Sequence, residues 1–428
     1  MGSGQMILPF AEQRHPARRP RPDLRHELLD FREFGKKTVV AATRAAGCHD
    51  HVGVETFVNE FWTSRQRAAH SLHEISYRAC FKPQLPRFFI ERLTQAGETV
   101  YDPFLGRGTT LLEAALLGRV PAGCDINPLS RILLAPRLRP PRPAEVAERL
   151  HLIDLTAHGE MPEDLLVFYH PDTLKQICAL RRHLLARPAE GRFDLVDDWI
   201  RMVAVNRLTG HSPGFFSVYT LPPNQAVSVE SQRKINAQRN QVPPLRDVRA
   251  LILRKTRALL SESDVGTREA LAKVSDRAVI LTQPACATPE IRSGSVALVV
   301  TSPPFLDVVD YAQDNWVRCW FCGIEARAVP ITVTRDLDAW MSAMTDVLRE
   351  VRRVLRDGGH VAFEVGEVKA GQIKLEEYVI ECGLAAGLEP LLVLINDQRF
   401  TKTAQCWGVS NNQKGTNTNR IVLFRKGA

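Results

Sequence analysis

The first residues that could do chemistry form a glycine loop. Residues 102–110 read DPFLGRGTT, and Asp125 follows after one predicted helix. A strand that ends in an acidic residue, turns on glycines and enters a helix brings its backbone close to a ligand, and an acidic residue at the next strand end can hold ribose hydroxyls. Gly106 and Gly108 permit this approach, and a following threonine can cap the helix. The lysine of a P-loop is absent, which argues against a triphosphate, while an ordinary glycine turn remains the alternative.

A second loop, residues 301–305, reads TSPPF and follows the apolar run 296–300. Two consecutive prolines at the end of a strand remove two backbone donors and stiffen the loop. The Ser302 hydroxyl and nearby carbonyl groups are then free to accept hydrogen bonds from an amino group, and the ring of Phe305 can stack on a planar ligand. A proline turn without a chemical role is the alternative, but ligands of α/β proteins bind at strand ends. The candidate catalytic residues are therefore Ser302, Pro303, Pro304 and Phe305.

These two loops need a sheet to position them. A β-rich run at 99–103, a helical run at 109–117 and a second strand at 120–124 predict one βαβ unit. Residues 137–275 read as mostly helical with one long loop rich in Pro, Gly, Asn and Ser, and the alternation of strands and helices resumes afterwards. The sequence predicts an α/β, doubly wound sheet that is interrupted by a large helical insert.

Four segments follow from this pattern. Residues 1–65 are basic, show little periodicity and are expected to form an N-terminal extension. We expect residues 66–136 to form the ligand-binding half of the sheet domain, residues 137–275 the insert, and residues 276–428 the half that carries the TSPPF loop.

The charge of the chain favours nucleic acid as a partner. The chain has 428 residues, with 56 Lys and Arg against 48 Asp and Glu, which gives a formal net charge of +8. Such an excess favours nucleic acid, although a membrane surface or an acidic protein would also fit. Residues 228–260 hold eight basic and two acidic side chains interleaved with Asn and Gln, a pattern that suits DNA phosphates and base edges as well as a solvated helix face. The candidate DNA-binding residues are Arg233, Lys234, Arg239, Arg246 and Arg249.

Other classes are disfavoured. We find no run of about 18 apolar residues and no signal-peptide core, so we expect a cytoplasmic protein without a membrane partner. The nine cysteines are scattered, as in a reduced protein. Cys319 and Cys322 have zinc-site spacing but no second pair, so we interpret them as structural thiols and expect no metal.

Taken together, the motifs resemble those of S-adenosylmethionine-dependent DNA amino-methyltransferases of the cytosine-N4 type. DPFLGRGTT is similar to the cofactor loop of that family, GCDINP to its ribose-binding strand end, and TSPPF to its catalytic loop. SYRACFKPQLPRFFIERL resembles the segment that precedes the glycine loop and closes the cofactor pocket. The order of the motifs, cofactor loop before catalytic loop with a long insert between them, also resembles the family, in which such an insert carries target recognition.

The resemblance implies a Rossmann-like methyltransferase sheet, methyl transfer from S-adenosylmethionine to the N4 amine of a cytosine flipped out of double-stranded DNA, and a role in DNA methylation. A cognate restriction endonuclease and association with the nucleoid are further expectations. The cofactor-binding residues that it implies are Phe81, Pro83, Asp102, Pro103, Phe104, Gly106, Gly108, Thr109, Thr110, Asp125, Ile126, Asn127 and Thr301.

Alternatives stay open at this point. The segment ILTQPACATPE has no acidic residue before Glu290, where family members often place one near the adenine of the cofactor. A non-catalytic nucleic-acid-binding homologue is therefore one alternative. Adenine-N6 methylation stays open because its geometry is similar, and methylation of an RNA base stays open because related loops modify RNA bases. Methylation at carbon 5 of cytosine is disfavoured because the chain has no Pro-Cys dipeptide.

Overall fold

A computed structural model of the chain describes residues 23–46, 53–62, 69–77, 80–157, 159–220, 226–304, 311–330, 336–368, 373–397 and 418–427. Phe305 of the predicted catalytic loop lies outside the described residues.

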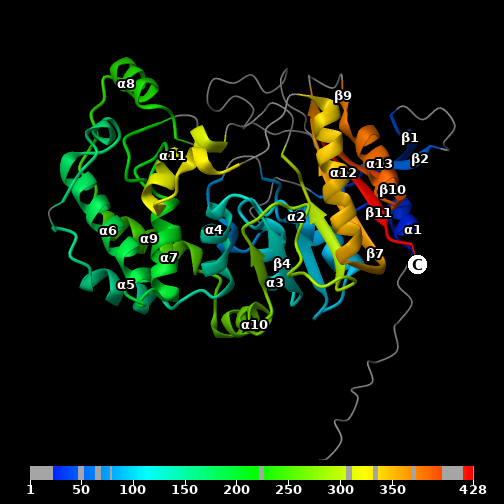
Figure 1. The fold of residues 1–428 in the computed structure, drawn as a ribbon, viewed down its shortest axis with the longest axis horizontal. Helices are drawn as coiled ribbons and strands as arrows, with labels where there is room; N and C mark the ends of the chain where they lie inside the picture. Colours follow the sequence, from blue (N-terminus) through cyan, green and yellow to red (C-terminus); the bar gives the residue numbers. More distant parts are fainter. Residues whose placement is uncertain are drawn as a thin grey trace, which may run out of the picture.

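A central sheet organises the described part of the chain (Figure 1), and its nine strands run in the order β1-β2-β10-β11-β7-β6-β3-β4-β5. The block from β7 to β5 is parallel, and β11 is antiparallel to both β7 and β10. From β3 the chain adds β4 and β5 on one side and later β6 and β7 on the other, which confirms the doubly wound α/β prediction. The bounds are β1 (Val39–Thr43), β2 (Val54–Asn59), β3 (Thr99–Asp102), β4 (Val120–Cys124), β5 (Val279–Leu281), β6 (Val296–Thr301), β7 (Leu355–Val365), β10 (Glu389–Asp397) and β11 (Thr418–Arg425).

The point between β3 and β6 is where the strand order reverses. In open α/β sheets the crevice at such a switch point, outside the carboxyl ends of the strands, is where ligands bind. The glycine loop follows β3 and the TSPPF loop continues from β6, so the topology brings the two predicted loops to the same edge of the sheet.

Both faces of the central strands are covered. All six residues of β6 are buried, with Leu298 and Val300 packed in one core and Val296 and Val299 in the other. A strand buried on both sides has no polar face, which explains its continuous apolar sequence. Helices on the first side are α1 (Leu24–Asp30) and α2 (Gln84–Leu93), and those on the second side are α12 (Leu337–Val354) and α13 (Leu375–Ala385).

A helical body lies beside the sheet (left in Figure 1), and most of its helices fall between β4 and β5 in the chain. Its core surrounds Trp199, which is fully buried and donates its indole N–H to the Thr256 hydroxyl at 3.1 Å. The helices that contribute to this core are α3 (Thr109–Leu116), α4 (Pro128–Leu138), α5 (Pro143–Leu152), α6 (Pro171–Ala189), α7 (Leu195–Val205), α9 (Val248–Leu259), α10 (Val265–Ser275) and α11 (Tyr311–Cys322), with α8 (Val229–Gln238) on its outside.

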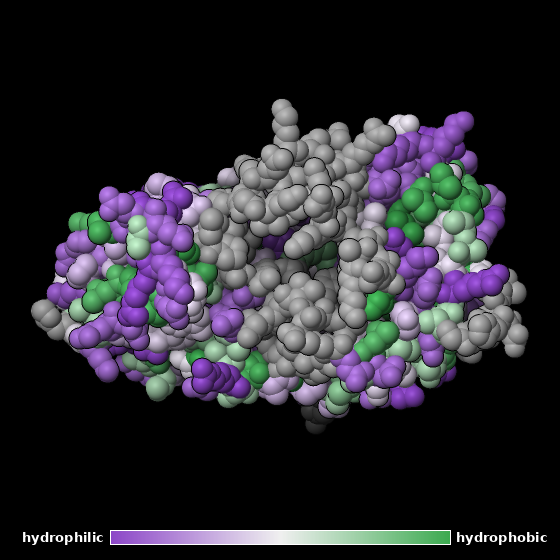
Figure 2. Space-filling view, turned by 90° about the horizontal axis from the view of Figure 1, so that it is seen from above, coloured by the Kyte–Doolittle hydropathy of each residue, from purple (hydrophilic) through white to green (hydrophobic). Residues whose placement is uncertain are grey.

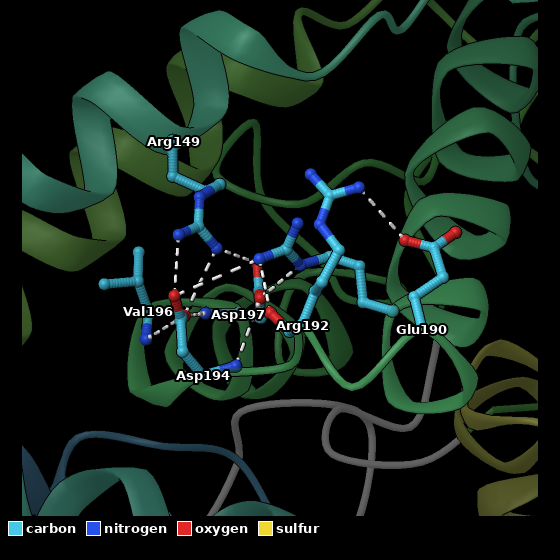
Figure 3. A network of polar contacts seen from close by, with 7 residues as sticks. Arg149, Glu190, Arg192, Asp194, Val196 and Asp197 are labelled. Atoms are coloured by element: carbon cyan, nitrogen blue, oxygen red, sulfur yellow. Dashed lines mark hydrogen bonds and ion pairs between the residues drawn. The ribbon is translucent and has the colours of Figure 1, made fainter.

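Charged side chains fix the start of α7 (Figure 3). Asp194 accepts hydrogen bonds from the backbone N–H groups of Val196 and Asp197, so it caps the helix. Arg149 from α5 donates to Asp194 at 2.6 Å and also pairs with Asp197, which is fully buried. Two helices of the insert are thereby held in one relative position.

The sequence predicted that residues 1–65 form an extension. The described strands of this segment, β1 and β2, are instead part of the sheet. β1 and β2 form a hairpin, and β2 pairs in parallel with β10, extending the sheet by two strands. Phe57 and Trp62 pack in the core beneath α1 and α2. The buried Asn396 side chain also accepts the N–H groups of Phe61 and Trp62 at 2.7 and 3.1 Å, so β10 holds this segment through backbone and side-chain bonds.

Short elements complete the described chain, and within it no helix has the length and apolar character needed to span a bilayer. These elements are η1 (Ser71–His73), η2 (Glu163–Val167), η3 (Ala326–Ala328), β8 (Glu367–Val368) and β9 (Ile373–Lys374).

Candidate functional site

A buried carboxylate joins the ends of the two central strands. Asp102 is 1% exposed, and its Oδ1 accepts the Thr301 hydroxyl at 2.6 Å and the Phe104 N–H at 3.0 Å. Thr110 on α3 donates its hydroxyl to the carbonyl of Val300 at 3.0 Å. Burial raises the pKa of Asp102 to about 7 against the lowering effect of these hydrogen bonds. Asp102, Thr110 and Thr301 therefore hold the two loops in register from behind.

The glycine loop requires its glycines. Gly106 and Gly108 have φ values of 52° and 78°, in the left-handed region where a side chain is strained. A Cβ on Gly108 would also lie 2.8 Å from Cδ1 of Leu134 on α4. Gly108 is the N-cap of α3 and no side chain caps the helix, so neither threonine has the capping role that the sequence suggested. Thr109 instead accepts a hydrogen bond from Arg107 at 3.0 Å.

Asp125 connects the glycine loop to the next strand end. Its Oδ2 accepts the Gly106 N–H at 2.7 Å, and its Oδ1 accepts the Asn127 N–H at 2.8 Å. Burial raises the pKa of Asp125 above its ordinary value, and these backbone hydrogen bonds oppose that effect. Each carboxylate oxygen has a second lone pair, so the group can still accept the two hydroxyls of a ribose.

An arginine that sequence reasoning missed supports the loop from below. Arg137 on α4 is fully buried, and it donates to the carbonyl groups of Leu133 at 2.7 Å, Leu72 at 3.2 Å and Arg107. Burial, followed by repulsion from Arg107, lowers the pKa of Arg137 to about 9. Because a buried guanidinium must satisfy its donors, Arg137 fixes the backbone at the tip of the glycine loop.

The two loops line one cavity of about 270 Å³. Asp125 and Gly106 form one part of its wall and Ser302 another, so the structure brings both sequence motifs to a single site. The predicted residues among its lining are Pro103, Phe104, Gly106, Asp125, Ile126, Asn127, Ser302, Pro303 and Pro304.

Other predicted residues do not line the cavity. Asp102, Thr110 and Thr301 are buried behind it, and Gly108 and Thr109 begin α3. Phe81 packs against the core around α2 and accepts a hydrogen bond from Arg107 through its carbonyl at 3.4 Å, while Pro83 is the N-cap of α2.

Several lining residues were not predicted. Tyr77 accepts a hydrogen bond from the Asn127 side chain at 3.3 Å, and Trp340 donates its indole N–H to the carbonyl of Pro304 at 3.1 Å. Past the end of β5 the wall consists of Pro284, Ala285 and Cys286, which agrees with the missing acidic residue in that segment. The remaining wall comes from Pro330 and from further residues of α12.

Ser302 is held by a carboxylate at the end of β7. Its hydroxyl hydrogen-bonds Glu364, which is 6% exposed and also accepts the Asn419 amide at 3.0 Å. Burial raises the pKa of Glu364, and the bonds from Ser302 and Asn419 oppose that rise. When Glu364 is ionised it can only accept, so the Ser302 hydrogen points to it and the Ser302 lone pairs are left for a ligand.

The five candidate DNA-binding residues have different environments. Arg233 and Lys234 are exposed on α8, where they pair with Asp164 at 3.3 Å and Glu230 at 2.6 Å. Arg239 is exposed and lies over the Tyr219 ring at 3.9 Å, and Arg246 is half-buried. Arg249 donates to the carbonyl groups of Leu150 and Ile153 at 2.8 and 2.7 Å, so its guanidinium satisfies the end of α5.

The amides in the same segment are also used internally. Asn236 donates to the carbonyl of Val167 at 2.8 Å, and Gln241 donates to the carbonyl of Tyr219 at 2.9 Å. Asn236 and Gln241 therefore help to hold the insert together, and the base-edge role that the composition of the segment suggested stays a prediction.

Fold and site together define an α/β domain in which a glycine loop and a Ser-Pro-Pro loop line one cavity at the switch point of the sheet. Residues 39–130, which contain the glycine loop, match the DNA methylase family model of the N6 and N4 type. The matched residues include the glycine loop through which the sequence resembles DNA amino-methyltransferases. S-adenosylmethionine, the methyl donor of such enzymes, is the cofactor that the Asp125 and glycine-loop geometry fits.

Curated relatives agree with the family. The type II methyltransferase M.BsoBI of Geobacillus stearothermophilus is 24% identical over 313 residues, which cover 64% of this chain and 57% of that protein. The type II methyltransferase M.MvaI of Kocuria varians is 29% identical over 116 residues, covering 26% and 24% of the two chains. Among solved structures, TrmN from Thermus thermophilus is similar over 83% of this chain and 51% of that chain, with 12% identity and a TM-score of 0.32. The matched part of the chain thus spans little more than half of M.BsoBI and a quarter of M.MvaI.

Proposed function

We propose that this protein transfers a methyl group from S-adenosylmethionine to the exocyclic N4 amine of a cytosine in double-stranded DNA. The observation that carries the proposal is the shared cavity, which is lined both by Asp125 and Gly106 and by Ser302 and Pro304. A cofactor and a planar amine bound to these two loops would meet inside one enclosure.

The cofactor half rests on Asp125 and the apolar walls beside it. Asp125 would accept the ribose hydroxyls, while Phe104 and Ile126 would cover the flat faces of the nucleoside. Bound S-adenosylmethionine would supply an electrophilic methyl group. The residues of the chain then have to place the amine in line with that methyl group, and correct placement supplies a large part of the rate enhancement.

The amine half rests on Ser302. The N4 lone pair of cytosine is delocalised into the ring, so the amine is a poor nucleophile. Hydrogen bonds from the amine to the Ser302 oxygen and to a carbonyl of the Pro303 region favour the more tetrahedral amine, whose lone pair is available. Glu364 keeps the Ser302 oxygen turned toward the amine by accepting the hydroxyl hydrogen, and Trp340 fixes the Pro304 carbonyl. Phe305 is proposed to stack on the base.

A base in a duplex cannot enter such a cavity, so the target would be flipped out at a cost of about a few kcal/mol. The helical insert is proposed to hold the surrounding duplex, with exposed Arg233, Lys234 and Arg239 available to phosphates. Arg249 is left out of this role because its guanidinium is used at α5. The naming of the relatives as type II methyltransferases supports a cognate restriction endonuclease as a further part of the proposal.

The product base decides between N4 and N6 chemistry. Duplex DNA is incubated with the protein and S-adenosylmethionine, digested to nucleosides and separated by mass spectrometry against both standards. We expect N4-methylcytosine, because Ser302 occupies the position at which an adenine-N6 enzyme usually has an acidic residue. N6-methyladenine would overturn the cytosine assignment, and methylation of RNA in preference to duplex DNA would overturn the substrate.

Removal of the Asp125 carboxylate should weaken cofactor binding. A charge-assisted hydrogen bond contributes about 1.5–3 kcal/mol, so we expect Asp125→Ala to raise the dissociation constant for sinefungin by about 10- to 100-fold in calorimetric titration. Asp346→Ala is the matched control, because Asp346 also borders the cavity but pairs with Arg349 of its own helix. Equal affinities of the Asp125 variant and the wild type would contradict the ribose assignment.

A further inference from the structure

A cluster of cations lies where the loop after α7 meets α9, outside the basic stretch highlighted by the sequence. Arg207 begins this loop, and Arg254 and Lys255 lie on α9. A Cβ placed on Gly214 of the loop would be 3.8 Å from Nη1 of Arg207 and 3.4 Å from Nη2 of Arg254. Arg207 donates to the Gly214 carbonyl at 3.4 Å and Arg254 donates to the Pro213 carbonyl at 3.3 Å, so both guanidinium groups lie at the same stretch of backbone.

Within the described chain, the two arginines of this cluster lack a matching negative charge, while Lys255 has one acidic neighbour. Within the described chain neither Arg207 nor Arg254 forms an ion pair, and the acidic neighbour of Lys255 is the exposed Glu74 at 3.7 Å. Arg207 is 9% exposed, and its buried Nε has no hydrogen-bond partner. Burial, followed by repulsion from Arg254, lowers the pKa of Arg207 to about 10, and burial, followed by repulsion from Arg207, lowers that of Lys255 to about 8. Buried cations without a counter-charge cost free energy, and an anionic ligand would remove that cost.

The loop that carries Arg207 is held in place before any ligand binds. Phe216 donates its N–H to the Arg207 carbonyl at 2.8 Å, and Gly210 pairs with Tyr219 in a β-bridge. The Arg207 guanidinium lies over the Phe215 ring at 4.1 Å. A guanidinium fixed by stacking loses little freedom when it binds an anion.

The cluster adjoins the wall of the cavity. The side chain of Asn206, the residue before Arg207, accepts the N–H of Ser76 at 2.8 Å. Tyr77, which follows Ser76 in the chain, lines the cavity. The helical body that carries α7 and α9 also presents a largely hydrophilic surface when seen from above (left in Figure 2). A backbone contact thus links the segment that carries Arg207 to the segment that lines the cavity.

We propose that Arg207, Arg254 and Lys255 bind a backbone phosphate of the DNA substrate next to the flipped base. The proposal rests on the proposed function, since it assigns the anion to the same substrate. Guanidinium forks bind phosphate oxygens through paired charge-assisted hydrogen bonds, and a lysine adds a point charge. Because phosphate contacts carry no base information, the cluster would position the duplex without reading its sequence.

Salt dependence of DNA binding tests the cluster. Each phosphate neutralised by a protein changes the slope of log K against log salt by about 0.9. We expect Arg254→Gln in the full-length chain, measured by fluorescence anisotropy with a labelled duplex and sinefungin, to weaken binding several-fold for any sequence and to flatten this slope by about one. Arg257→Gln is the matched control, because Arg257 is exposed on the same helix one turn closer to its end.

The outcomes separate this proposal from the proposed function. An unchanged slope for both Arg254→Gln and Lys255→Gln, in a protein that still methylates DNA, overturns the phosphate site alone. A flattened slope in a protein that methylates no DNA supports the site and contradicts the enzymatic function. Wild-type protein that binds no duplex overturns both. Sinefungin affinity should stay at the wild-type value in both variants, which shows that the cavity is intact.

Discussion

Replacing Ser302 by alanine should reduce the rate of methyl transfer by about 10²- to 10³-fold, the range found when one fixed hydrogen-bonding group is removed from a polar active site. The lost hydroxyl is the group that would accept the hydrogen bond from the amine. Because Ser302 contributes no contact to Asp125 or to the glycine loop, the affinity for sinefungin should change by less than about twofold, corresponding to a free-energy change well below one hydrogen bond.

Single-turnover transfer of a labelled methyl group to duplex DNA measures the rate, and calorimetry measures the affinity for sinefungin. Ser295→Ala is the control, because Ser295 lies just before the start of β6 and donates only to the carbonyl of Arg292 at 2.5 Å. Undiminished turnover of Ser302→Ala would exclude the hydroxyl from the chemistry. Loss of cofactor affinity together with turnover would instead indicate that the variant had disturbed the cavity.

The parts of the site that the sequence predicted are those whose chemistry is local. Gly106 and Gly108 are needed for backbone conformations that other residues adopt at a cost, so the loop is recognisable from a few letters. The strands β4 and β6 were predicted almost to the residue because their apolar runs end at Asp125 and at the prolines. Their parallel, switch-point arrangement then followed from the βαβ pattern.

Features that depend on long-range contacts were missed. β2 is short and half-exposed at its start, and its place in the sheet depends on β10, more than 300 residues later. In the sequence, Arg137 is one more cation in a predicted helix. Its role depends on a bond to the carbonyl of Leu72, which is distant in the sequence and close only in the fold. The charge count of residues 228–260 identified a basic segment correctly. It could not tell Arg249, which is half-buried and makes two short bonds to carbonyls at the end of α5, from Arg254, which is exposed and makes one longer bond to the Pro213 carbonyl.

Glu364 was also missed because its role depends on long-range contacts. Its replacement is expected to have the second large effect on the rate of methyl transfer. The sequence shows it as one acid in the apolar second half of β7, and its partners Ser302 and Asn419 come from two other strand ends. We expect Glu364→Gln to slow methyl transfer by about 10- to 100-fold, which corresponds to about 1.4–2.7 kcal/mol of transition-state stabilisation. An amide can donate as well as accept, so the Ser302 hydroxyl would lose its fixed direction.

The pH dependence distinguishes this positioning role from a merely structural one. Burial raises the folded-state pKa of Glu364 above 4.5. In the wild type, methyl transfer should therefore fall as the pH drops through that raised value, because protonated Glu364 becomes a donor and turns the Ser302 hydroxyl around. Glu364→Gln cannot titrate, so its slower rate should lack this acid limb, as measured by single-turnover rates at saturating cofactor across the acid range.

The effect of Glu364 on the stability of the fold should have the opposite pH dependence to its effect on the rate of methyl transfer. An acid whose pKa is raised by folding binds its proton more tightly in the folded state, so it favours unfolding as the pH rises from 4.5 to the raised value. Glu364→Gln removes that contribution, and its melting temperature should depend less on pH in this window than that of the wild type. A variant that lost activity only through damage to the fold would show a lower melting temperature and keep the wild-type acid limb. Retention of the limb would thus exclude Glu364 as the group that orients Ser302.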